Sequence, residues 1–90
     1  MVKKSLNKDK QQTISCHNIW ETSFLVYNKI PFLKTDILNG KIIFHFIDNP
    51  EVQNILQKFV MNPDVRLQEY ISIFQRIKTI IYQEKKKNEE

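Results

Sequence analysis

The sequence predicts a single small domain of the α+β class. Its 90 residues allow one modest core. An Asn-Gly dipeptide at 39–40 separates two runs of strand-forming residues, which is the pattern of a β-hairpin, and two capped helical patterns follow it. We therefore expect a short N-terminal helix, an antiparallel hairpin with strands at about 32–38 and 41–47, and helices at about 50–61 and 65–84 packed on one face of the hairpin.

The segment 13–30, which holds the expected N-terminal helix, fits either a helix or a strand. Trp20, Phe24 and Tyr27 have helical spacing, but the residues between them are rich in strand formers. We assign a short helix to it, which Pro31 must end.

The Asn-Gly loop fixes the register of the hairpin, because both loop positions need a positive φ. Leu38 then pairs with Lys41, and Lys34 pairs with His45. Alternation assigns the side chains to two faces. The expected core face holds Leu33, Thr35, Ile37, Ile42, Phe44 and Phe46, and the opposite face holds Phe32, Lys34, Asp36, Ile43, His45 and Ile47.

His45 has polar neighbours in this register. Lys34 lies across from it and Asp36 lies nearby, so these three residues form a polar contact face on the less buried side of the hairpin. No cysteine, second histidine or carboxylate pair is close to His45 in the sequence, which favours a structural role. The alternative is a titrating contact to a partner or an anion.

The two C-terminal helices are predicted from their caps and their period. Asp48 or Asn49 caps the first helix, Pro50 suits its first position, and its apolar stripe needs the core face of the hairpin. That stripe consists of Val52, Ile55, Leu56, Phe59 and Val60. An Asn-Pro-Asp sequence at 62–64 ends this helix and begins the next.

The last helix carries more apolar surface than one contact requires. Its first stripe consists of Leu67, Tyr70, Ile71, Phe74, Ile77 and Ile81. A heptad-like seam on one flank consists of Tyr70, Ile73, Ile77 and Ile80. We expect this seam to be an interface with a second copy or another protein, the alternative being a wide core face.

The excess of positive charge lies at the two ends of the chain, whose formal net charge is +4. Residues 1–12 carry four lysines against one aspartate, and residues 85–90 carry three lysines against two glutamates. Residues 13–84 hold seven basic and seven acidic side chains. We expect a disordered basic tail over 1–12, one neutral folded domain over 13–84 and a charged tail over 85–90.

No catalytic, metal or cofactor site is predicted. Gly40 is the single glycine, which excludes the glycine-rich phosphate loops. Each acidic residue of the hairpin and the helix starts is explained by a turn, a strand or a cap. Cys16 is the single cysteine, so it forms no internal disulfide. Because adjacent side chains point apart, we do not expect Cys16 and His17 to form a nucleophile and base pair. We expect a buried thiol beside an exposed imidazole, the alternative being a catalytic thiol.

Three stretches, ETSFLVYN, GKIIFHFIDNPEVQNILQKF and DVRLQEYISIFQRIKTIIY, follow one another in an order that resembles a family of small proteins of unknown function from phages, prophages and other mobile elements. In that family a Thr-Ser segment precedes a hairpin strand that ends in Phe-x-Phe and an acid, and two helices follow. The matching positions are Thr22 and Ser23, 44–48, 65–66 and 78–82. The chain departs from the family by being shorter between Tyr27 and Phe32, and the resemblance implies no activity.

The expected function is that of a non-catalytic interaction protein of phage or mobile-element type, which binds a protein partner or itself. The start of the chain is polar and no apolar run could cross a bilayer, so we expect it in the cytoplasm of the host cell, without membrane contact. The alternative is a small nucleic-acid-binding regulator that uses the hairpin and the lysine-rich tails. Its phosphate contacts would be Lys34 and Lys41, which are few for useful affinity.

Overall fold

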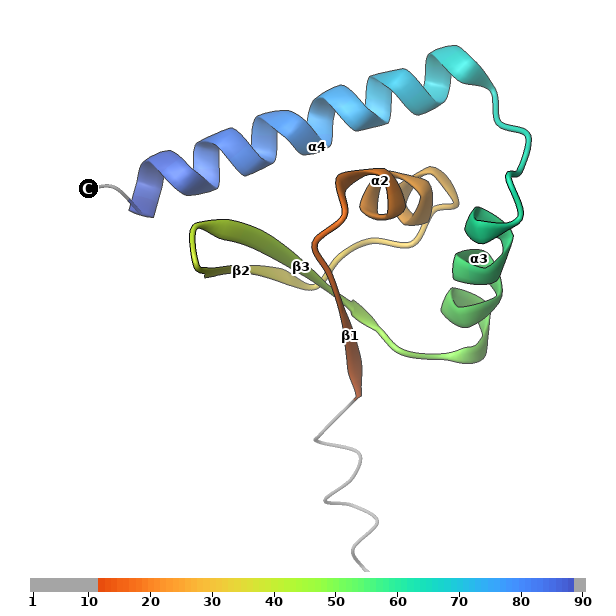
Figure 1. Ribbon diagram of the computed structural model, residues 1–90, viewed down its shortest axis with the longest axis horizontal. Coiled ribbons are helices and arrows are strands. Elements are labelled where there is room, and N and C mark those ends of the chain that lie inside the picture. Colours follow the sequence, from red (N-terminus) through yellow and green to blue (C-terminus); the bar gives the residue numbers. More distant parts are fainter. Residues whose placement is uncertain (1–11, 89–90) are drawn as a thin grey trace, which may run out of the picture.

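The computed structural model describes residues 12–88, which form an antiparallel sheet and three helices (Figure 1). The elements in chain order are β1 (Thr13–Cys16), α2 (Ile19–Tyr27), β2 (Lys34–Leu38), β3 (Lys41–Ile47), α3 (Pro50–Val60) and α4 (Leu67–Asn88). The strand order in the sheet is β1-β3-β2, and the α+β class is confirmed. Among the described helices, none combines the length and the hydropathy that a membrane crossing requires.

The first described element is the strand β1 and not a helix, which corrects the predicted element order. β1 pairs with β3, so that Ile14 lies opposite Phe46 and Cys16 lies opposite Phe44. A strand of four residues has little preference of its own, and its pairing with β3 defines it. Except for Gln12, the predicted tail 1–12 lies outside the described residues.

The helix α2 occupies the part of segment 13–30 in which helix and strand patterns compete. Its start is capped by Asn18, whose side-chain oxygen accepts hydrogen bonds from the amides of Trp20 at 2.8 Å and Glu21 at 3.2 Å. After its end, Lys29 has a φ of 69° and Pro31 follows. The chain therefore turns sharply before it enters the hairpin.

The predicted register of the hairpin is confirmed. Lys34 pairs with His45 and Leu38 pairs with Lys41, as the two-residue loop requires. Asn39 and Gly40 have φ values of 51° and 79°, as expected for a tight hairpin loop. Ile42, Phe44 and Phe46 of β3 are buried as predicted, but Ile43, which was predicted on the less buried face, is buried as well.

The predicted faces are wrong just before β2, which begins at Lys34 and not at 32. The amide of Leu33 donates to the carbonyl of His45 at 2.7 Å, although His45 already faces Lys34. Leu33 and Lys34 thus both lie opposite His45, as in a β-bulge. The extra residue moves the side chains of Phe32 and Leu33 to the faces opposite to those predicted. The ring of Phe32 lies 4.9 Å from that of Phe44 in the core, while Leu33 is 50% exposed. Ile37, also predicted in the core, is exposed as well.

The two C-terminal helices pack mainly against α2, an arrangement that the prediction did not include. α4 also contacts β3 of the hairpin, as predicted, whereas α3 packs against α2 (Figure 1). Val60 of the predicted α3 stripe is 77% exposed, because α3 buries a narrower face. The common core consists of Cys16, Phe24, Leu25, Ile42, Phe44, Phe46, Val52, Ile55 and Ile77.

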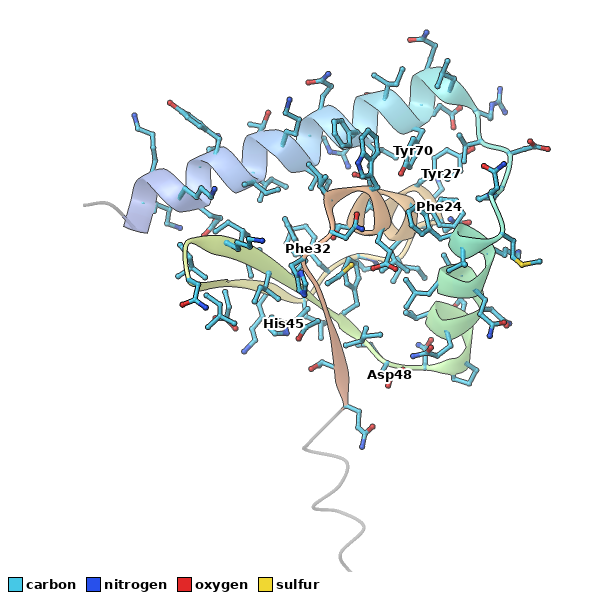
Figure 2. The ribbon with its side chains drawn as sticks, in the orientation of Figure 1. Phe24, Tyr27, Phe32, His45, Asp48 and Tyr70 are labelled. Carbon is cyan, nitrogen blue, oxygen red and sulfur yellow. The ribbon has the colours of Figure 1, made fainter. Side chains whose placement is uncertain are left out.

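Two tyrosines attach α4 to the rest of the domain. The Tyr27 hydroxyl accepts a hydrogen bond from the amide of Arg66 at 2.8 Å, just before α4 begins. The Tyr70 hydroxyl donates to the carbonyl of Trp20 at 2.7 Å. Together with Phe24, these rings gather where α2 meets the start of α4 (Figure 2). Hydrogen bonds therefore join both ends of α2 to the start of α4, one at Trp20 and one at Tyr27. The helix itself continues through 85–88, which were predicted to be tail.

Candidate interaction surfaces

The structure brings together the predicted polar contact face of the hairpin. His45 Nε2 lies 2.9 Å from Asp36 Oδ2, and Lys34 Nζ lies 4.0 Å from the same oxygen. On the other side of β3, the Ser15 hydroxyl lies 3.3 Å from His45 Nδ1. His45 therefore connects the central strand to both edge strands. Ser15 was missed because β1 was missed, since the alternation of Thr13, Ile14, Ser15 and Cys16 is too short to predict a strand by itself.

The order Ser15, His45, Asp36 is also the order of a hydrolase relay. A neutral imidazole can accept from the serine hydroxyl at one nitrogen while it donates to the carboxylate at the other. The hollow near the hairpin turn, however, is lined by His17, Leu38, Asn39, Lys41 and Ile43, and not by the relay residues. The three side chains form a row of cross-strand contacts over the sheet.

Lys34 and Lys41, the predicted phosphate contacts, do not form one site. Lys34 lies opposite His45, and His45 is four residues from Lys41 along β3. Four residues correspond to about 13 Å along a strand. Lys34 also lies beside the carboxylate of Asp36. Each lysine is therefore a separate surface charge.

Cys16 is buried, with 4% of its surface exposed, and His17 is exposed, as predicted. Burial raises the pKa of the Cys16 thiol to about 11, and the negative charge of Glu21 acts in the same direction, while a hydrogen bond with Thr22 opposes them. The thiol Sγ donates to Glu21 Oε1 at 3.4 Å. Because the thiolate is the nucleophilic form, this cysteine is a core group and not a reactive one near neutral pH.

The predicted interface seam of α4 faces the interior of the domain. Ile77 belongs to the core, with 2% of its surface exposed, and Tyr70, Ile73 and Ile80 pack against that core. This corresponds to the alternative of a wide core face. In the single chain the seam is covered by the chain itself.

The exposed apolar surface of α4 lies on a different flank. We call it the outer stripe. Leu67 is 62% exposed, Ile71 40% and Tyr82 64%, although the first two were predicted to face the core. The outer stripe consists of Leu67, Ile71, Phe74, Lys78, Ile81, Tyr82 and Lys85, which lie within about one third of the helix circumference. Ile81, at the edge of the stripe nearest the interior, is partly buried and also packs against the core. Two of its rings carry lysine ammonium groups above them, Lys78 over Phe74 and Lys86 over Tyr82.

Trp20 extends the outer stripe onto α2. Its ring stacks on Phe74 with a centroid distance of 4.2 Å and an interplanar angle of 15°. Even so, 51% of its surface remains exposed. Exposed aromatic and apolar side chains of this kind are enriched at protein–protein interfaces. Val60 and Met61, at the end of α3, are also exposed.

Comparison with known proteins identifies one family. Residues 11–83 match the family described as Domain of unknown function (DUF5659). The match covers every described strand and helix except the last turns of α4. No curated protein and no protein of solved structure shows significant similarity to the chain.

Proposed function

This chain belongs to the DUF5659 family, and we propose that it is a non-catalytic interaction protein that binds a protein partner through the outer stripe of α4 and Trp20. The observation that carries the proposal is the exposure of Trp20, Leu67 and Ile71 on one continuous flank. The resemblance of the hairpin and helix motifs to proteins of phages and mobile elements supports an origin of that type, with action in the host cytoplasm.

The chemistry of the outer stripe suits a protein surface. Trp20 and Phe74 are held against each other by stacking, so that little side-chain entropy remains to be lost when a partner covers them. Trp and Tyr are enriched among the residues that dominate binding energies, and both occur here. The lysines over the rings, Lys78 within the stripe and Lys86 beside it, give this surface a positive charge.

Nucleic-acid binding is the second candidate, and the exposed lysines 85–87 in the last turn of α4 favour it. Lys34 and Lys41 add less, because they lie far apart and Asp36 partly neutralises Lys34. Binding of this kind would weaken steeply with salt. A fluorescent oligonucleotide titrated at low and high salt distinguishes it from binding by an apolar stripe.

Site-specific photocross-linking tests the protein-binding proposal. A photoreactive residue at Ile71 would lie in the outer stripe, whereas the same residue at Ser72, one position along α4, would point away from it. We expect a discrete adduct in the producing cell from position 71 and not from position 72. The adduct should disappear when Leu67→Lys is added. Equal adducts from both positions, or none, would contradict the proposal.

A further inference from the structure

We infer that the partner of the outer stripe is a second copy of this chain, with the two α4 helices packed antiparallel. The inference rests on the proposed function, because it names the occupant of the same surface. It uses the spacing of the stripe, the position of its charges and the contacts that its aromatic rings already make.

The spacing of the outer stripe is that of a coiled-coil seam. Its central residues are Leu67, Ile71, Phe74, Lys78, Ile81 and Lys85, which alternate steps of four and three. This alternation gives a mean period of about 3.5 residues, which keeps a seam facing a second helix along its whole length. The seam spans about 27 Å of α4 at the usual rise of a helix.

The two lysines of the seam determine the direction. In a parallel pair, Lys78 would face Lys78 of the second copy and Lys85 would face Lys85, so like charges would meet in the seam. In an antiparallel pair centred between Phe74 and Lys78, Lys78 faces Phe74, Ile71 faces Ile81, and Leu67 faces Lys85. Every lysine then meets an apolar or aromatic side chain along which its stem can pack.

A contact of the single chain supports this pairing. The Lys78 ammonium already lies 5.8 Å from the centroid of the Phe74 ring, so the same attraction can be made across the twofold axis. The antiparallel arrangement also places the lysines at 85–87 opposite the start of the other helix, where Arg66 and Glu69 form an ion pair. The complementarity of the stripe to itself therefore rests on the seam residues, where each lysine meets an apolar or aromatic side chain.

Solution mass by light scattering on the full chain tests the inference. We expect a dimer for the wild type in the micromolar range and at least about tenfold weaker association for Ile71→Lys, since a charge would face Ile81. Ser72→Lys, which adds the same charge away from the stripe, should leave the dimer intact. A wild-type monomer, or a dimer that Ile71→Lys leaves unchanged, would overturn the inference.

Disulfide trapping tests the direction. Under mild oxidation, Ile71→Cys chains mixed with Ile81→Cys chains should form a mixed disulfide in the antiparallel pair, whereas each variant alone should not. A disulfide between two Ile71→Cys chains, or between two Ile81→Cys chains, would show a parallel pair and overturn the inference. The photocross-link separates the two proposals: an adduct of twice the chain mass supports both, an adduct with another protein supports only the binding function, and no adduct contradicts both.

Discussion

His45 connects three strands through side-chain contacts that remain partly open to water. Its partners Ser15 and Asp36 can exchange their bonds for bonds to solvent, so each contact adds little net stability. We expect His45→Ala to lower the free energy of unfolding by no more than about 1 kcal/mol, measured by chemical denaturation. A larger loss that depends on pH near neutrality would show that the imidazole has a role beyond strand pairing.

Ser23 lies in the Thr-Ser segment and is fully buried in α2. Its hydroxyl has no hydrogen-bond partner among residues 12–88. Since a buried hydroxyl without a partner costs free energy, Ser23→Ala should leave stability unchanged or raise it by up to about 1 kcal/mol. Thermal unfolding of the variant measures this. A clear loss of stability would mean that the hydroxyl is bonded in solution.

Cys16 should make stability depend on alkaline pH. The folded state holds the thiol proton up to about pH 11, whereas the ordinary pKa is 9.0. The folded state therefore binds more protons in this interval, and the stabilisation is complete below about pH 9 and is lost as the pH rises towards about 11. Burial also raises the pKa of the Tyr70 hydroxyl, which adds to the loss of stability at alkaline pH in both the wild type and a Cys16→Ala variant. Denaturation of Cys16→Ala over this range should show a shallower decline than wild type, and equal slopes would contradict the burial of the thiol.

The hairpin is the element that local sequence chemistry specifies most fully. Gly40 has a φ of 79° and open space where a Cβ would lie, so a substitution there affects backbone strain alone. Gly40→Ala should destabilise the domain by about 1 kcal/mol, and Gly40→Asn by less, because Asn tolerates this conformation. Urea denaturation of both variants checks the order. Equal effects would mean that the turn relaxes to another type.

The register of the hairpin was predictable because two adjacent residues determine it. The start of α2 also carried a readable signal, since Asn18 is followed by Glu21 three positions later. β1 was not predictable in the same way, because its four residues become a strand only when β3 lies beside them. The bulge at Leu33 likewise has no local signature, yet it reverses which of Phe32 and Leu33 is buried.

At the scale of the whole molecule, the orientation of α4 determines which surface is free. Its sequence is apolar over more than half of its circumference, and either flank could face the interior. The packing of α4 against α2, together with the hydrogen bonds of Tyr27 and Tyr70, selects the side of Ile77. Sequence analysis found the excess of apolar surface but placed it on the opposite flank, because the location of α2 depends on the tertiary fold.

The orientation of α4 is tested most directly by comparing Ile77→Ala with Ile71→Ala in chemical denaturation at a protein concentration low enough for a monomer. Both variants remove the same atoms from the same helix. Ile77 is 2% exposed and Ile71 40% exposed, so we expect a loss of about 2–5 kcal/mol for Ile77→Ala and less than about 1 kcal/mol for Ile71→Ala. Equal losses, or a larger loss for Ile71→Ala, would show that the outer stripe belongs to the core and would remove the surface on which the proposed function depends.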